Sequence, residues 1–299
     1  MPEPGLSQRC QVWAVLNVTP DSFSDGGEAF TLEAALDKAK RLLADGADIL
    51  DVGGASSRPP GATYGQGAQP VSTEEELARV VPVVRALTHE LGARVSIDTT
   101  RAEVARAALD AGATIVNDVS NGASEALLEV VAAASAELVL MHNRGDGSVS
   151  GDNAQYRSVI DDVIAELSAA AVRASCAGVA FGKIWLDPGI GFAKNAGASL
   201  AVLAALPRVL QLGYRVLVGP SRKSFIAAVE RQAGAKESTP QQRIGGTAAA
   251  VTAAVLAGAH GVRVHDVREM RQAVLLTEAL RSIGGGVVSS AAWRGGFAC

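Results

Sequence analysis

The sequence predicts a single (β/α)8 barrel, the TIM-barrel fold, in which eight parallel strands alternate with helices. Two observations carry this prediction: eight short β-rich apolar runs recur along the 299 residues, and segments with helical spacing lie between them. Barrels of this class commonly form one domain of about 250 residues, which the chain can supply. We expect an N-terminal extension over residues 1–11, the barrel over 12–283, and a flexible Gly- and Ser-rich tail over 284–299.

The predicted strands are rich in Val, Ile and Leu, as expected of parallel strands that are buried on both faces. In chain order they are Val12–Leu16, Ile49–Val52, Val95–Ile97, Thr114–Val116, Leu138–Met141, Ile184–Leu186, Val216–Val218 and Val262–Val264. Helical spacing is clear at Leu32–Leu43, Glu74–Leu91, Val104–Ala111, Val159–Val172 and Thr247–Leu256. Gly46, Gly112 and Gly258 are predicted to end three of these helices, because glycine adopts the left-handed conformation without steric cost.

An open doubly wound sheet is the alternative that the same alternation allows. It is disfavoured because neither a glycine-rich dinucleotide fingerprint after the first strand nor a Walker A loop occurs. The longer connections follow the first, second and fifth strands, at Thr19–Phe30, Gly53–Ser72 and His142–Asn153. Long loops after the strands of a barrel belong to its catalytic face, so we expect the chemistry at that end.

Composition excludes several classes of function. The chain is 48% hydrophobic with a formal charge of −4, which leaves no basic patch for nucleic acid or an anionic membrane surface. Its longest apolar stretch, around residues 248–257, is shorter than the roughly 18 residues of a membrane span. The three cysteines, Cys10, Cys176 and Cys299, lack the spacing of a zinc site or a disulfide framework, which favours a reducing cytoplasm.

Polar residues lie at the end of every apolar run, either directly after it or within its last residues. They are Asn17, Asp51, Asp98, Asn117 with Asp118, His142, Asp187, the Ser221–Ser224 turn, and Arg263 with His265. Barrel geometry directs the ends of all eight strands toward one mouth. The acids and amides Asp98, Asn117 and Asp187 suit the N–H groups of a heterocycle. The cations Arg58, Lys223, Arg263 and His265 suit an anion. The residues alone therefore predict a substrate with a ring and a phosphate.

The segment Asn17–Gly27, with the sequence NVTPDSFSDGG, resembles the signature of the dihydropteroate synthase family. Six further segments resemble family motifs in the family's order: Gly53–Pro59, Ser96–Thr99, Asn117–Val119, Leu186–Phe192, Gly219–Phe225 and Arg263–Val267. The resemblance runs from about Val12 to Ile283. It implies transfer of the dihydropterin-6-ylmethyl group from its diphosphate to the amine of 4-aminobenzoate, which gives 7,8-dihydropteroate for folate biosynthesis.

The resemblance also implies roles for individual residues. The pterin would be held by Asp98, Asn117, Met141, Asp187 and Lys223. The diphosphate would be bound by Asn17, Ser57, Arg58, Arg263 and His265, with Asn17 a ligand of the cofactor Mg²⁺. The 4-aminobenzoate pocket would contain Phe23, Pro59 and Ser224. The catalytic residues would be Lys223, Arg58, Arg263 and His265, because cations stabilise the departing diphosphate of an SN1-like reaction. The family also implies a homodimer that pairs through outer helices.

Two other functions fit the same barrel. A pterin-dependent methyltransferase would share the pterin acids but need no diphosphate site, and a pterin-binding paralogue would keep the ring site without turnover.

The second loop departs from the family pattern. It has Ala55 where the family has an acid, Ser57 where it has threonine, and an additional Pro60. We expect these differences to shift the balance between 4-aminobenzoate and its sulfonamide mimics, because both compete for one pocket.

Overall fold

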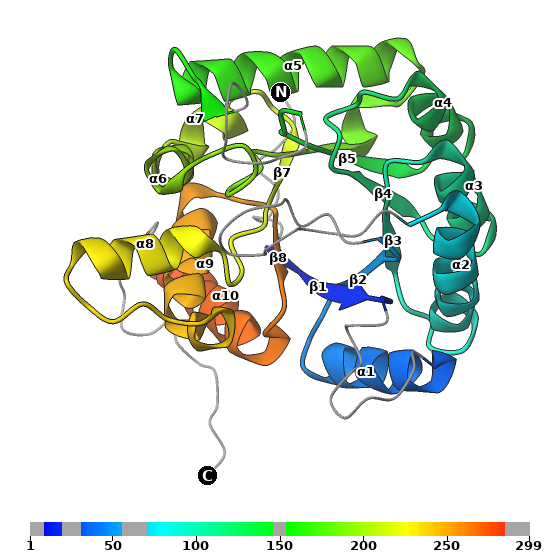
Figure 1. Cartoon of the computed structure of the whole chain (residues 1–299), viewed down its shortest axis with the longest axis horizontal. Helices are drawn as coiled ribbons and strands as arrows, with labels where there is room; N and C mark the ends of the chain where they lie inside the picture. The colour runs from blue at the N-terminus through cyan, green and yellow to red at the C-terminus, as the bar shows by residue number, and fades with distance from the viewer. Residues whose placement is uncertain (1–8, 20–30, 56–70, 146–153, 285–299) are drawn as a thin grey trace.

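The computed structural model describes residues 9–19, 31–55, 71–145 and 154–284, and its eight strands close into a barrel (Figure 1). Strand β1 pairs in parallel with both β2 and β8, and every other strand pairs in parallel with its sequence neighbours. The strands are β1 Gln11–Asn17, β2 Ile49–Gly53, β3 Val95–Asp98, β4 Ile115–Asp118, β5 Glu137–Met141, β6 Ile184–Asp187, β7 Arg215–Val218 and β8 Gly261–Val264. The pairing of β1 with β8 confirms the predicted barrel and excludes the open sheet.

Helices surround the strands as an outer ring (Figure 1). They are α1 Leu32–Ala44, α2 Thr73–His89, α3 Ala102–Asp110, α4 Glu125–Ala133, α5 Val159–Cys176, α6 Ala196–Ala204, α7 Leu206–Leu210, α8 Ser224–Gln232, α9 Ile244–Ala257 and α10 Val267–Gly284, with short 3-10 turns at Phe181–Lys183 and Pro240–Gln242. Within the described ranges, no helix is both long and apolar enough to cross a membrane.

Local sequence explains where these helices begin and end. The side chains that precede α1, α2, α4 and α6 each accept a hydrogen bond from the backbone amide three residues further on, which caps the helix. These caps are Thr31, Ser72, Ser124 and Asn195. The three glycines predicted to end helices, Gly46, Gly112 and Gly258, have φ angles of 102°, 108° and 105°, which confirms the left-handed conformation.

The barrel interior is built in two layers. The lower layer, near the N-terminal ends of the strands, is a buried apolar cluster of Trp13, Ile49, Ile115, Val139, Trp185 and Leu217. The Trp13 and Trp185 rings pack edge to face with their centroids 5.3 Å apart. Side chains alternate along a strand, so the residue two positions after each member of this layer also points inward. On β2, β4 and β6 those residues are Asp51, Asn117 and Asp187. The barrel interior therefore changes from apolar to polar between successive inward-pointing residues of these strands.

Candidate active site

An upper layer that is polar except for Met141 lies at the C-terminal ends of the strands. It consists of Asp51, Asp98, Asn117, Met141, Asp187 and Arg263, which come from β2, β3, β4, β5, β6 and β8. All but Arg263 are buried, and Arg263 is half-buried. Gly219, directly after β7, shows how closely three of the predicted residues approach. A Cβ placed on it would lie 3.8 Å from Asp187 Oδ2 and 3.9 Å from both Arg263 Cβ and Lys223 Nζ. The structure therefore brings the predicted ring site together.

Arg263 connects the acids of this layer. Its Nε donates to Asp51 Oδ2 at 2.6 Å and its Nη2 donates to Asp98 Oδ2 at 2.9 Å. Asn117 Nδ2 also donates to Asp51 Oδ2, at 3.2 Å. Burial acts to lower the pKa of Arg263, but the nearby carboxylates of Asp51 and Asp98 raise it above its usual range. The guanidinium is thus a fixed positive charge between two buried acids.

Asp98 and Asp187 are carboxyl groups whose protonation is shifted by their surroundings. Burial raises the pKa of Asp98 to about 7, although the charge of Arg263 opposes the shift. Burial also raises the pKa of Asp187, against the attraction of Lys223 and a hydrogen bond of 2.7 Å from the Gly189 amide to Asp187 Oδ1. Perturbed carboxyls that share a buried, polar layer are typical of a functional site.

Lys223 reaches this layer from the start of α8. Its ammonium donates to the Ile190 carbonyl and lies 4.5 Å from the centre of the Phe192 ring. Burial lowers the pKa of Lys223 to about 8, while Asp187 acts to raise it. The lysine is therefore held between β6 and the loop that follows it, next to Asp187, which the family resemblance assigns to the pterin.

The turn before α8 orients His265, which follows β8. The Ser221 hydroxyl lies 2.9 Å from His265 Nδ1 and accepts a hydrogen bond from the His265 backbone amide at 3.2 Å. Arg222 has a φ of 59°, a conformation that costs energy in a non-glycine residue. It is held there by a two-point ion pair with Asp266, with Nε at 3.0 Å and Nη2 at 2.5 Å from the two carboxylate oxygens. The turn is thus fixed at both ends.

Asn17 offers an oxygen ligand at the same mouth. A Cβ placed on Gly53 would lie 3.6 Å from both Asn17 Oδ1 and Asp98 Cβ, so the amide is directed toward the upper layer. Within the part of the chain that the structure describes, no hydrogen bond occupies the Asn17 side chain. Among the same residues, no cluster of three or more His, Cys, Asp or Glu side chains could hold a metal ion. A single amide oxygen fits Mg²⁺, which takes few protein ligands when a substrate phosphate supplies others.

The remaining predicted residues divide into two groups. Met141 is buried beside Asp187, its partner in the β5–β6 register, whereas Ser224 is exposed as the first residue of α8. The predicted residues Phe23, Ser57, Arg58 and Pro59 lie outside the described residues, and so does Pro60.

Sequence reasoning gave no role to Asp51, although the structure makes it the shared acceptor of Arg263 and Asn117. The missed signal is the spacing of two residues from Ile49 in the lower layer, which turns Asp51 inward. Its second oxygen, Oδ1, and the neighbouring Ser96 Oγ have no partner among the described residues. Sequence reasoning also gave no role to Lys194, which is buried beside the same site.

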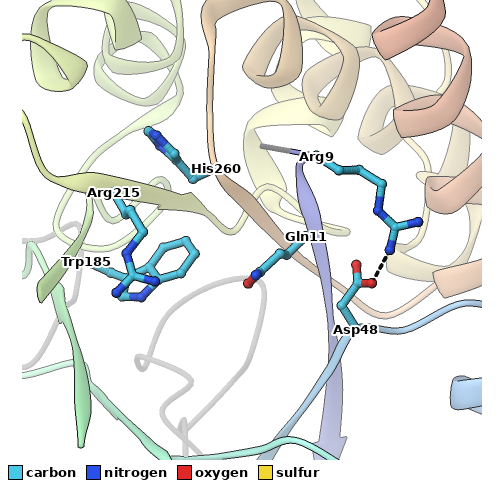
Figure 2. Close-up of a pocket in the computed structure, with 6 residues that line it drawn as sticks. All are labelled: Arg9, Gln11, Asp48, Trp185, Arg215 and His260. Atoms are coloured by element: carbon cyan, nitrogen blue, oxygen red, sulfur yellow. Dashed lines mark hydrogen bonds and ion pairs between the residues drawn. The ribbon is translucent and has the colours of Figure 1, made fainter. Parts of the chain in front are cut away.

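A cavity of about 280 Å³ lies at the opposite end of the barrel (Figure 2). It is lined by Arg9, Gln11, Asp48, Trp185, Arg215 and His260. Both of its arginines are already neutralised, because Arg9 pairs with Asp48 and Arg215 lies 3.0 Å from a Glu137 carboxylate oxygen. The upper layer, with its perturbed acids and lysine, is therefore the better candidate for chemistry.

Comparisons with known proteins agree with this geometry. The sequence pattern of the family described as pterin binding enzyme matches residues 13–265. The dihydropteroate synthase of Synechocystis sp. is 44% identical over 274 residues, which cover 91% of each chain. A solved structure of Xanthomonas albilineans dihydropteroate synthase with 4-aminobenzoic acid is 39% identical, has a TM-score of 0.82, and covers 92% of this chain and 94% of that one.

A second Xanthomonas albilineans structure, in complex with 7,8-dihydropteroate, is 36% identical with a TM-score of 0.80, covering 93% of this chain and 95% of that one. Identity at this level over nearly the whole length shows common descent as well as a common fold. The chain therefore belongs to the dihydropteroate synthase family of pterin binding enzymes.

Proposed function

We propose that this chain joins the methylene of (7,8-dihydropterin-6-yl)methyl diphosphate to the amine of 4-aminobenzoate and releases diphosphate, with the upper layer as its ring site. The observation that carries the proposal is the convergence of buried Asp98, Asn117 and Asp187 with the ammonium of Lys223. The pterin edge presents N–H groups that pair with carboxylate and amide oxygens. Asn117 uses its Nδ2 on Asp51, which leaves its amide oxygen to accept from the ring.

The anion end of the substrate would face the cations of the mouth. Arg263 donates hydrogen bonds from Nε to Asp51 and from Nη2 to Asp98, so Nη1 remains to donate to a diphosphate oxygen. His265, oriented by Ser221, supplies a second donor, and Arg58 and Ser57 complete the set that the family resemblance implies. Mg²⁺, held by Asn17 and the diphosphate itself, would supply charge neutralisation to the leaving group.

The reaction needs no covalent bond to the protein. The carbon–oxygen bond to the diphosphate breaks, and its electron pair leaves with the diphosphate oxygen. The electron-rich pterin shares the positive charge left on the methylene. The amine nitrogen of 4-aminobenzoate then forms the new bond and loses a proton. The contribution of Arg263, Lys223 and His265 is electrostatic, because fixed charges in a buried site stabilise developing charge without reorganisation.

One assay tests the reaction against its alternatives. Purified protein is incubated with the dihydropterin diphosphate, Mg²⁺ and 4-aminobenzoate, and dihydropteroate and diphosphate are measured together. Equal amounts of both products support the proposal. Tight ring binding without product would identify a non-catalytic pterin-binding paralogue, and methyl transfer from a methylated pterin to an acceptor would identify a methyltransferase.

We further propose that 4-aminobenzoate binds second. The family resemblance places Phe23, Pro59 and Ser224 around it, and ordering of the first and second loops over the diphosphate would complete its pocket. Calorimetry distinguishes the two orders: 4-aminobenzoate should bind the protein only when diphosphate and Mg²⁺ are present. Equally tight binding to the protein alone would contradict the proposed order.

A homodimer in the cytoplasm completes the proposal. Exposed apolar side chains recur along α10 at Leu276, Leu280 and Ile283, which share one helix face, and Leu256 of α9 is also exposed. We expect Leu276→Lys to lower the sedimenting mass from that of a dimer to that of a monomer. An unchanged mass would exclude this face as the interface. The cytoplasmic location rests on the cysteine spacing of the sequence and is tested by cell fractionation.

A further inference from the structure

Lys194 is a buried lysine that the proposed reaction does not use. It is 2% exposed and lies at the end of the loop that joins β6 to α6, which we call the β6–α6 loop (residues 188–195). Its Nζ donates to the carbonyls of Gly189 at 3.0 Å and Phe192 at 3.1 Å, and lies 2.8 Å from His142 Nδ1. Three acceptors thus surround the three N–H groups of one ammonium.

The β6–α6 loop turns sharply and includes one residue in an unfavourable backbone conformation. Gly189, Gly191 and Ala193 have φ angles of 66°, 79° and 48°, and Ala193 carries a side chain in a region that favours glycine. A Cβ on Gly189 would lie 1.9 Å from the His142 carbonyl oxygen, so the loop packs directly against the end of β5. The Lys194 ammonium holds the two ends of this bend together from inside.

The same loop supplies backbone partners to the ring site. The Gly189 amide donates to Asp187, and the Ile190 carbonyl accepts from Lys223. Lys194 bonds the Gly189 and Phe192 carbonyls on either side of Ile190. A shift of the loop would therefore move the acid and the cation of the pterin site together.

A chain of hydrogen bonds anchors Lys194 from the other side. His142 Nε2 lies 3.0 Å from Glu166 Oε2 on α5, and Arg144 Nε donates to both Glu166 carboxylate oxygens at 3.1 Å. Burial, together with the smaller effect of the Lys194 charge, lowers the pKa of His142 to about 3. The imidazole is therefore neutral, with Nδ1 as acceptor toward Lys194 and Nε2–H as donor toward Glu166.

We propose that Lys194 is a positioning residue for the pterin site, tying the β6–α6 loop to β5 so that Asp187 and Lys223 keep their places on the ring. This inference rests on the proposed function of the upper layer. It adds a residue that acts on substrate affinity without touching the substrate. It also assigns the chain that runs from buried His142 through Glu166 to Arg144 to the support of that residue.

The test measures ring binding and turnover separately in three variants. Lys194→Met keeps the length of the stem and removes all three donors, and Lys194→Arg keeps the charge. Lys183→Met is the matched control, because Lys183 is exposed and immediately precedes β6 at its other end. Calorimetry with 6-hydroxymethyl-7,8-dihydropterin, which lacks the diphosphate, reports the ring site alone, and urea unfolding of each variant checks that it is folded.

We expect Lys194→Met to weaken ring binding about tenfold, the loss expected from one charge-assisted hydrogen bond, and Lys194→Arg to recover most of it. Lys183→Met should bind as the wild type does, and the KM for 4-aminobenzoate at saturating pterin should not change in any variant. In a Lys223→Met background the Lys194→Met effect should shrink, because one route of action is gone. Wild-type ring affinity in Lys194→Met, or fully additive losses, would overturn the inference.

A pH profile decides the matter even if Lys194→Met does not fold. Burial lowers the pKa of Lys194 to about 7; Asp187 and Glu166 act to raise it, and Lys223 and Arg144 act to lower it. Above pH 7 the ring affinity of the wild type should therefore fall relative to that of Lys194→Arg, in which the side chain stays charged. The changes that come from Asp98, with its pKa of about 7, and from Lys223 are common to both proteins. Identical profiles would overturn the inference, and a wild type that binds no pterin would instead contradict the proposed function.

Discussion

Replacing Arg263 by methionine isolates the central charge of the upper layer. The variant leaves Asp51 and Asp98, which are 0% and 8% exposed, without the cation that now contacts both. Removing one partner of a buried ion pair costs about 3–5 kcal/mol, because the other charge stays buried and uncompensated. That is a large part of the roughly 5–15 kcal/mol that keeps a domain folded. We therefore expect a strongly destabilised protein at pH 8.

The stability that Arg263→Met loses relative to the wild type should become smaller as the pH falls, because Asp98 becomes protonated. Its pKa is raised to about 7 in the folded protein, and the attraction of Arg263 is what limits the rise. Without Arg263 the pKa of Asp98 rises further, so its charged form costs most stability above that pKa. Protonation at pH 5.5 removes this charge in both proteins. The difference in unfolding free energy between wild type and variant should therefore be smaller at pH 5.5 than at pH 8.

Urea unfolding at the two pH values measures both effects, and the buried Trp13 and Trp185 provide a fluorescence signal. Arg208→Met is the control, because Arg208 forms an exposed ion pair with Asp161 and exposed pairs contribute little. The reasoning would be refuted if Arg263→Met lost no more stability than Arg208→Met. It would be refuted equally by a difference that widens on acidification.

Three further predictions concern substrate binding. Burial lowers the pKa of Lys223 to about 8, so pterin affinity should fall as the pH rises through 8. Lys223→Met should bind the pterin roughly ten- to hundredfold more weakly. Calorimetry should also show that this variant loses the part of the pH dependence that comes from Lys223. Ser221→Ala removes a hydrogen-bond partner of His265, so the KM for the diphosphate substrate should rise about two- to tenfold and recover in Ser221→Thr. An unchanged KM counts against the orienting role. Asn17→Ala should need about tenfold more Mg²⁺ for half-maximal activity, and an unaltered Mg²⁺ requirement would exclude Asn17 as a ligand.

The strands and most of the ring site follow from local sequence. Runs such as Ile49–Val52 are short, apolar and bounded by turn residues, and barrel geometry brings the polar residues at the ends of these runs to one mouth. Asp98, Asn117 and Asp187 could therefore be assigned to one mouth before their contacts were known. The left-handed glycines were predictable for a similar reason, because one backbone angle decides them.

What the sequence could not predict depends on contacts across the barrel. The family resemblance assigns Arg263 to the diphosphate, and it gives no sign of the hydrogen bonds to Asp51 and Asp98. These two acids lie on strands more than 160 residues away in the chain. Lys194, in a segment that reads as a polar loop, becomes a buried cation only when that loop folds back onto His142. Such roles need tertiary packing, which no local pattern encodes.

The two-layer interior has a practical consequence for engineering this enzyme class. On β2, β4 and β6 the apolar residues of the lower layer and the polar residues of the upper layer occupy successive inward positions, yet they serve different purposes. A library confined to Trp13, Ile49, Val139 and Leu217 would sample thermal tolerance while leaving every substrate-facing group in place. Heat resistance and substrate choice could then be optimised in separate rounds, and the results combined in one chain.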